Sequence, residues 1–425
     1  MKTVSVSMAL MFTLLFITSF ADNSSNIDIR GKKLSVFVEM EKNSFSLINF
    51  EKNTWSKTLG KFLFPDLGND VEQTRDGGYI IAGMTILPLS LEVGGWLIKL
   101  NENGIKEWDR VFRNIDNLIG VEVLSDGYVV AGNGKKGDIE IIKMDEMGNV
   151  VWNKSFGGKY LDIIKSCGCI KRTENGCIIL VTSWSFSNNK GADLWLIKID
   201  ENGNEEWNRT YGKAKEADIG YQVIESNDEG YIIVGQSFNL SAPEYGLIMK
   251  VDENGNEKWS IRTGYSIFSV ESAGNSSYIA TGSKWIKENI DYALLLLKFN
   301  EKGEIKWIKM FGSKDSDDAG YFIIHADGGS YIICGNSDYR GDNNIWLLKI
   351  DENGNEKWSK IYGKRGWDMG RCIKQTYDGG YIIVGETTQF PWMFFPYRLN
   401  LWIIKTDENG EVSLLKSFLR NQSET

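Results

Sequence analysis

The sequence predicts an all-β fold, a β-propeller of four-stranded antiparallel blades, and three observations carry that prediction. A stretch of the type Trp-Leu-x-Lys-Ile-Asp-Glu-Asn-Gly-Asn-Glu-x-Trp, clearest at 195–207 and 346–358, recurs along the chain. A second stretch, Asp-Gly-Gly-Tyr-Ile-Ile-Val-Gly at 378–385, recurs between copies of the first. The paired stretches repeat about every fifty residues, which is a period typical of propeller blades.

Each repeat is expected to supply four strands joined by tight turns. Short β-branched and aromatic runs between Asp, Asn and Gly clusters are typical of strands and hairpins, and Asn-Gly and Gly-Gly tolerate positive φ. The second and third strands, such as 231–235 and 346–350, are continuous apolar runs. That pattern indicates burial on both faces, which blades stacked around an axis provide.

The tryptophans of the fourth strands are expected to pack between blades. They are Trp55, Trp108, Trp152, Trp207, Trp259, Trp307 and Trp358, with Leu414 in the eighth place. Seven complete blades are therefore predicted over residues 61–419, with boundaries at 61–112, 113–157, 158–212, 213–263, 264–312, 313–363 and 364–419. The third-strand lysines, such as Lys99 and Lys405, must pair or reach solvent, so we expect an ion pair or carbonyl contact in each blade.

Residues 22–60 are interpreted as a degenerate first blade, with strands at 34–38, 46–50 and 54–60. This gives eight blades; seven is the alternative if the first strand near 27–29 does not form. Because the last repeat is predicted to have its own fourth strand, the ring is expected to close by packing between blades, without an exchanged strand. Residues 420–425 are left as a C-terminal tail.

The N-terminal segment 1–21 has the pattern of a secretory signal peptide. Lys2 precedes an apolar stretch at 4–20, and Ser19-Phe-Ala21 is a small-x-small cleavage site. We therefore expect a secreted or cell-surface protein. Retention of the segment as an uncleaved anchor is the alternative, and it is the one route by which we expect the chain to be held on a membrane.

The repeats resemble those of secreted bacterial and archaeal β-propellers, which are related in pattern to the tryptophan-docked blades of quinoprotein-like propellers. The resemblance rests on Asp-Gly-Gly-Tyr-Ile-Ile-x-Gly and Trp-Leu-Ile-Lys-x-Asp-x-Asn-Gly-Asn-x-x-Trp, and covers residues 61–419. It implies the fold and no single activity. Quinone-dependent catalysis is not carried over, because the adjacent Cys-Cys pair of those enzymes is replaced here by Cys167-Gly-Cys169.

Composition and charge exclude some functions. The net charge of −9 argues against a nucleic-acid partner. His325 is the single histidine, so a catalytic site in which a histidine activates a nucleophile is not indicated. Five cysteines are an odd number for a disulfide framework. Buried free thiols are the expectation, and a metal site around Cys167, Cys169 and Cys177 is the alternative.

Four aspartates share one repeat position at the start of the first strand: Asp66, Asp218, Asp318 and Asp368. First strands line the axis of a propeller, so these carboxylates are expected near the mouth of the central channel. A structural role, with each Asp accepting hydrogen bonds from the turn beside it, competes with two functions. One is binding of a cation, with calcium as the candidate; otherwise no cofactor is expected. The other is carbohydrate-active catalysis by paired carboxylates.

Two apolar loops between second and third strands distinguish their repeats from the rest. One contains Leu87 and Leu89; the other contains Phe390, Trp392, Phe394, Phe395 and Tyr397. Such aromatic density on a loop indicates a covered surface, either by a partner or by folding back over a blade seam. The function expected is therefore a non-catalytic binding scaffold for a protein or a glycan. The alternatives are the carbohydrate-active enzyme and a purely structural repeat module, so catalysis is left undecided, with no catalytic residue named.

Overall fold

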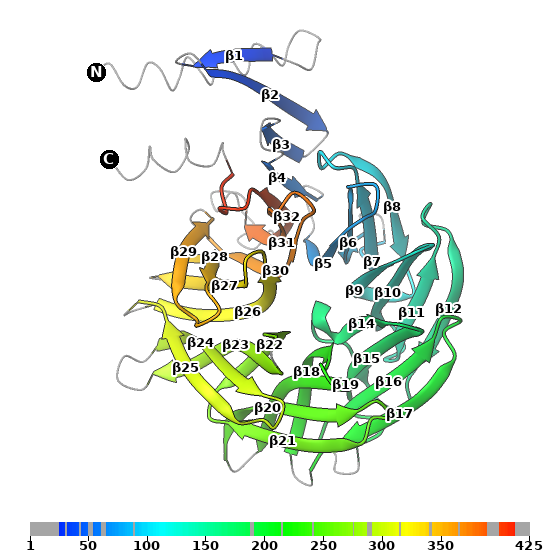
Figure 1. Ribbon diagram of the computed structural model, residues 1–425. Coiled ribbons are helices and arrows are strands. Elements are labelled where there is room, and N and C mark those ends of the chain that lie inside the picture. The colour runs from blue at the N-terminus through cyan, green and yellow to red at the C-terminus, as the bar shows by residue number, and fades with distance from the viewer. Residues whose placement is uncertain are drawn as a thin grey trace.

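The computed structural model of the chain describes residues 25–29, 32–41, 44–49, 54–60, 65–87, 90–187, 191–213, 216–239, 242–274, 276–286, 291–313, 316–339, 342–363, 366–388 and 399–412. Their strands form seven sheets arranged radially around a central axis (Figure 1). The predicted β-propeller of four-stranded antiparallel blades is confirmed, with seven blades, the alternative count.

Blades one to three begin after the N-terminal strands, and their innermost strands line the axis. Blade one contains β5 (Asp66–Gln73), β6 (Tyr79–Ile86), β7 (Val93–Leu100) and β8 (Lys106–Phe112). Blade two contains β9 (Ile115–Leu124), β10 (Gly127–Gly134), β11 (Ile139–Met144) and β12 (Val150–Phe156). Blade three contains β13 (Asp162–Ile163), the 3-10 turn η1 (Cys167–Cys169), β14 (Ile170–Thr173), β15 (Gly176–Ser183), β16 (Asp193–Asp200) and β17 (Glu205–Tyr211).

Blades four to six follow the repeat closely. Blade four contains β18 (Glu216–Glu225), β19 (Gly230–Asn239), β20 (Ala242–Asp252) and β21 (Glu257–Thr263). Blade five contains β22 (Ser266–Ser272), β23 (Ser277–Ile286), β24 (Asp291–Asn300) and β25 (Ile305–Phe311). Blade six contains β26 (Ser316–Ala326), β27 (Ser330–Tyr339), β28 (Asp342–Ile350) and β29 (Glu356–Tyr362).

Blade seven joins the two ends of the chain. Its inner strands are β30 (Asp368–Gln375), β31 (Tyr381–Thr388) and β32 (Leu399–Thr406), and its fourth strand is β4 (Thr54–Leu59). In β4, Trp55 pairs with Lys405, in the same register as Trp358 with Lys349 in blade six. The ring is thus closed by an exchanged N-terminal strand, and the prediction of closure by packing alone is wrong.

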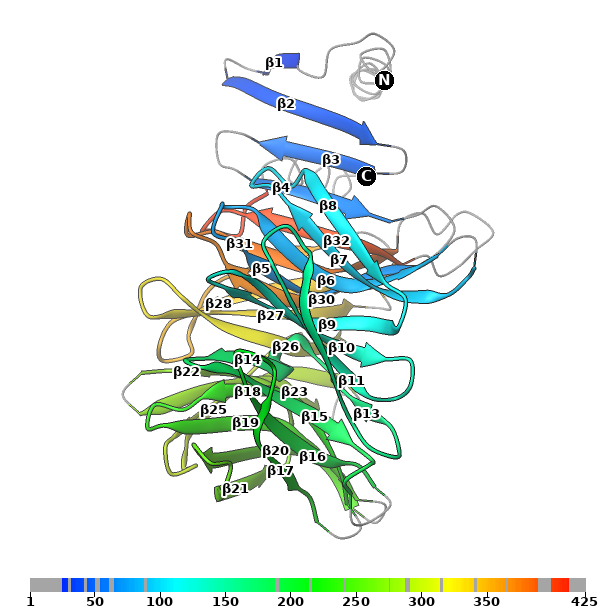
Figure 2. The same cartoon turned by 90° about the vertical axis from the view of Figure 1, so that its right-hand side faces the viewer.

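The prediction of a separate degenerate first blade at 22–60 is also wrong. Strands do form there: β1 (Ser25–Ile29), β2 (Lys32–Glu41) and β3 (Ser44–Asn49) precede β4. They extend the sheet of blade seven outward (Figure 2). The physical reason is that 54–59 carries the tryptophan of a fourth strand, whereas the last repeat offers Leu414 at that place. Leu414 itself lies outside the described residues.

The fourth-strand tryptophans pack between blades, as predicted. Each indole lies over the glycine of the turn between the third and fourth strands of the next blade. A Cβ on any of these seven glycines would lie 2.6–3.1 Å from the indole: Gly104, Gly148, Gly203, Gly255, Gly303, Gly354 and Gly410. Trp55 alone among the seven is fully buried, at 1% exposed; its strand has a neighbour on both edges, whereas the other six lie at sheet edges.

Six of the seven third-strand lysines make the predicted ion pair or carbonyl contact, whereas Lys349 of blade six pairs with a hydroxyl group instead. Four of them bind the aspartate of the turn between the first and second strands of their own blade: Lys99 with Asp76, Lys143 with Asp126, Lys250 with Asp228 and Lys405 with Asp378. In blade six, Lys349 donates to the hydroxyl of Tyr381 in blade seven. Within the described residues, no helix has the length and apolar character needed to cross a membrane.

Candidate binding face

The ring has two faces of different construction. The turn face carries the tight hairpins that follow the first and third strands of each blade. The loop face carries the starts of the first strands and the loops between second and third strands. The turn face repeats from blade to blade, whereas the loop face varies, so the loop face is the candidate for specific binding.

Most of the predicted apolar loop residues lie outside the described part of the structure. They are Leu89, Phe390, Trp392, Phe394, Phe395 and Tyr397. Leu87 is half-buried, and its backbone bonds Glu92 and Leu91. The two loops leave the loop face from neighbouring blades, since β6–β7 belong to blade one and β31–β32 to blade seven. No degenerate blade separates them.

The four predicted aspartates are held within their own blades. Each lies within the first three residues of a first strand, is buried, and lies opposite a Ser or Thr of the second strand: Asp66 with Thr85, Asp218 with Ser237, Asp318 with Ser337 and Asp368 with Thr387. Asp318 accepts hydrogen bonds from the Ser313 N–H at 3.1 Å and the Ser316 hydroxyl at 2.8 Å. No three of the four converge among the described metal-capable groups. The arrangement favours the structural role.

Asp162 of blade three plays the same part, although sequence reasoning missed it. Its carboxylate accepts the Gly158 N–H at 2.9 Å and the Ser183 hydroxyl at 2.5 Å. The buried position of Asp218 disfavours its charged form. Burial, reinforced by Glu216 and Asp193, raises its pKa to about 6, against the opposing effect of Ser237 and Arg262.

Three aromatic side chains form an arc at the channel mouth. Tyr221, Phe268 and Tyr321 each occupy a β-bulge in the first strand of their blade. Their ring centroids are separated by 5.3 Å (Tyr221 to Phe268) and 5.5 Å (Phe268 to Tyr321). A bulge redirects the extra side chain, and here it places consecutive rings in contact across blades four, five and six.

A pocket of about 190 Å³ opens beside this arc, between blades five and six. Phe268, Tyr321 and Tyr292 supply aromatic walls, and Asp317, Asp318, Asn336 and Ser283 supply polar groups. Tyr292 is 43% exposed and contacts Trp285, which is 47% exposed. The pocket is smaller than the roughly 300–1,000 Å³ of small-molecule sites, so its size suits one side chain or one sugar ring.

The polar lining of the pocket is rich in acceptors. Asn336 is only 8% exposed, its amide NH₂ donates to Asn343, and its Oδ1 has no hydrogen-bond partner among the described residues. Asp317 is exposed and accepts the N–H of Tyr292 through one oxygen. Burial raises the pKa of Tyr321, so its hydroxyl stays protonated. A buried acceptor without a donor is costly, and a ligand that donates hydrogen bonds relieves that cost.

The carboxylates of this pocket do not form a glycosidase pair. Asp317 and Asp318 are consecutive in β26, and consecutive strand residues point to opposite faces. Asp318 is also occupied by the Ser313 and Ser316 contacts. Two carboxylates that face each other across a sugar, as hydrolysis requires, are therefore not formed here.

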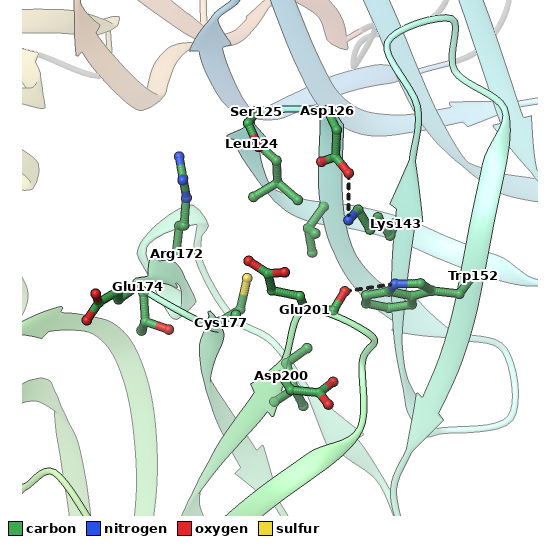
Figure 3. A pocket seen from close by; sticks show the side chains of 14 residues that line it. Leu124, Ser125, Asp126, Lys143, Trp152, Arg172, Glu174, Cys177, Asp200 and Glu201 are labelled. Atoms are coloured by element: carbon green, nitrogen blue, oxygen red, sulfur yellow. Dashed lines mark hydrogen bonds and ion pairs between the residues drawn. The ribbon is translucent and has the colours of Figure 1, made fainter.

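The turn face has a second hollow, between blades two and three (Figure 3). Its volume is about 70 Å³, enough for a few water molecules. Its lining includes the pair Asp126–Lys143 at 2.9 Å and Trp152, whose indole N–H donates to the Glu201 carbonyl at 3.2 Å. Other blades repeat contacts of both kinds, such as Lys99 with Asp76 and the Trp259 indole N–H with the Glu301 carbonyl, so we assign this hollow to the blade seam.

The sequence carried a signal for the aromatic arc that was not recognised. Tyr221 and Tyr321 directly follow Gly220 and Gly320 in the same Asp-x-Gly stretch that drew attention to the aspartates. A glycine inside a strand often marks a bulge. Asn336 had no sequence signal, because it depends on the approach of blade five to blade six.

Comparisons with known proteins identify the shape only. No family profile and no curated protein matches the chain. Solved structures do: Chaetomium thermophilum Sqt1 bound to the N-terminus of ribosomal protein L10 has a TM-score of 0.48 and 8% identity, covering 80% of this chain and 97% of that one. Drosophila Plexin A in complex with Semaphorin 1b has a TM-score of 0.44 and 9% identity over 81% and 87%. A protein of unknown function from Dyadobacter fermentans has a TM-score of 0.45 and 10% identity, covering 68% of this chain and 95% of that one. These values carry no functional argument.

Proposed function

We propose that this protein is a non-catalytic interaction scaffold that binds a protein partner through its loop face, with a basic side chain of the partner entering the pocket between blades five and six. The observation that carries the proposal is the pairing of aromatic walls with acceptors and carboxylates in that pocket. A planar guanidinium stacks on aromatic rings and offers five donors. It also neutralises Asp317.

A secreted or cell-surface location belongs to the same proposal and rests on the 1–21 segment. N-terminal sequencing of the exported chain should find a start near Asp22. A mature protein that keeps Met1 in the cytosol would refute this part without affecting the pocket.

The binding test uses arrayed short peptides of the type Gly-Arg-Gly, Gly-Lys-Gly and Gly-Gln-Gly, together with a glycan array. We expect retention of the Arg peptides over the Lys peptides, and little retention of the Gln peptides. Tyr321→Ala and Asp317→Asn should each weaken Arg-peptide binding about tenfold, since one exposed cation–π or charged contact contributes about 1 kcal/mol or somewhat more. Asp317→Asn keeps an oxygen for the Tyr292 N–H, so the backbone contact survives.

Tyr377→Ala is the matched control, because Tyr377 is 72% exposed in a hairpin of the turn face. It should bind as the unmodified chain does. Retention of neutral glycans with loss in Tyr321→Ala would move the ligand class to carbohydrate. If neither the Arg peptides nor the glycans are retained in a way that depends on Tyr321, this pocket is not the binding site.

A further inference from the structure

The first strand of blade three is interrupted at the axis. Between β13 and β14 the chain forms η1, which places Cys167 and Cys169 on different sides. The Cys169 Sγ lies 3.2 Å from the Tyr221 carbonyl oxygen of blade four. Cys167 instead joins the apolar core that blades one, six and seven share. The two thiols therefore face different blades.

Gly168 makes this crossing feasible. A Cβ at Gly168 would lie 2.5 Å from the Gln222 side chain, so a larger residue would push η1 away from blade four. The Ser166 hydroxyl also donates to the Tyr221 carbonyl. The interrupted strand is thus fixed on one side, while Cys167 reaches the opposite side of the channel.

Three buried ligand atoms from three blades meet at that point. They belong to Asp70 of blade one, Cys167 of blade three and Cys372 of blade seven, and all lie within 4.8 Å of one another. The Cys372 Sγ is 3.0 Å from Asp70 Oδ1. The Cys167 Sγ is 3.8 Å from the Arg371 carbonyl oxygen. Two thiols, a carboxylate oxygen and a carbonyl oxygen therefore converge.

This donor set matches the chemistry of a borderline-soft divalent cation. Zinc binds thiolate sulfur at about 2.3 Å and oxygen at about 2.0–2.2 Å in a tetrahedron, which separates neighbouring ligand atoms by roughly 3.3–3.8 Å. The two measured separations of 3.0 and 3.8 Å lie near this range. Small side-chain rotations are enough to adjust them.

The surroundings orient the carboxylate and balance charge. Asp70 Oδ2 accepts the Val121 N–H at 2.8 Å, and Oδ1 accepts the Val71 N–H at 2.8 Å. Such outer contacts orient metal ligands. Lys374, which pairs with Glu72, supplies positive charge near the cluster. Without metal, the Cys372 S–H donates to Asp70.

We propose that Asp70, Cys167 and Cys372 bind a divalent cation of the Zn²⁺ type, with the Arg371 carbonyl as the fourth ligand. The ion replaces the thiol protons and links blades one, three and seven across the axis, beside the blade that closes the ring. This inference is independent of the proposed binding function.

The test uses the full chain, reduced and then freed of metal by a chelator. Titration with Co²⁺ should reach one equivalent and produce thiolate-to-cobalt charge-transfer absorption in the near ultraviolet. Zn²⁺ should displace Co²⁺ and raise the melting temperature, because a ligand that binds the native state stabilises it. Cys167→Ser and Cys372→Ser should abolish the charge-transfer band or weaken binding by more than about 10–100-fold, which is the loss typical of even an outer-sphere change.

Asp70→Asn and Cys177→Ser complete the design. Gln222 shows that an amide serves at the position of Asp70, since its Oε1 accepts the Val270 N–H at 2.7 Å in blade five. Asp70→Asn should therefore fold and bind Co²⁺ more weakly. Cys177→Ser removes a buried thiol outside the cluster and should leave the titration unchanged. No charge-transfer band in the reduced parent, binding that persists in both cysteine variants, or a Cys167–Cys372 disulfide in protein purified without reductant would each overturn the proposal.

Discussion

The turn face and the loop face of the ring are built from the same strands, yet one repeats and the other does not. On the turn face, seven tryptophans meet seven glycines, and at least four blades repeat the Lys–Asp pair. On the loop face, the arc of Tyr221, Phe268 and Tyr321 occurs in three consecutive blades only. Repetition identifies contacts that hold blades together, and its absence identifies surface available for recognition.

The largest effect is expected from removing the exchanged strand. A chain that starts at residue 61 lacks β4, so β32 keeps β31 but loses its outer partner, and Gly104 loses the Trp55 indole. We expect failure to fold or a large fall in melting temperature. A chain that starts at residue 52 retains β4 and should stay folded, as measured by circular dichroism and calorimetry. Equal stability of the two truncations would contradict seven-blade closure.

The tryptophans of the turn face should contribute unequally to the free energy of unfolding. Trp55→Ala removes a fully buried indole and should cost about 3–5 kcal/mol in the free energy of unfolding. Trp207→Ala removes a half-buried one and should cost about 1–3 kcal/mol, since less apolar area is lost. Urea denaturation of both variants measures this. A larger loss of unfolding free energy for Trp207→Ala than for Trp55→Ala would contradict the deeper burial of the tryptophan at the ring closure.

Asp218 should make stability depend on pH. Its pKa of about 6 in the folded chain lies above the ordinary value of 3.8. The folded state therefore binds the proton more tightly. This contribution is complete below about pH 4 and is lost as the pH rises through about 6. As the pH rises from 4 to 7, the free energy of unfolding of Asp218→Asn should increase by about 2–3 kcal/mol relative to that of the parent. A difference that does not change with pH would place the Asp218 pKa in its usual range.

The smallest effect on stability is expected on the loop face. Exchanging both Trp392 and Phe394 for Ser should change the free energy of unfolding by no more than about 0.5 kcal/mol if the 390–397 loop is an exposed contact surface. Thermal melts of the double variant measure this. A fall of several kcal/mol would show instead that the loop covers the seam between blades seven and one, and would leave no role for it in binding.

The binding and metal candidates differ in how far they were predictable. The loop aromatics and the four aspartates were proposed from their positions in the repeat; the aromatics lie outside the described residues, and Asp318 accepts local hydrogen bonds. The pocket at Asn336 and the cluster of Asp70, Cys167 and Cys372 were not found. Cys167 and Cys372 are 205 residues apart in the chain, and no spacing rule joins residues brought together by ring closure.

The sequence alone determined the blade. Period, turn glycines, third-strand lysines and interblade tryptophans are local patterns, and in every blade except blade seven the strands are consecutive in the chain. The tertiary structure alone decided how the ring ends meet. Whether residues 54–59 or the last residues of the chain supply the final strand is a competition between segments about 350 residues apart. Residues 54–59 supply it, because the Trp55 indole packs on Gly104 of blade one. That contact exists only once the ring has closed.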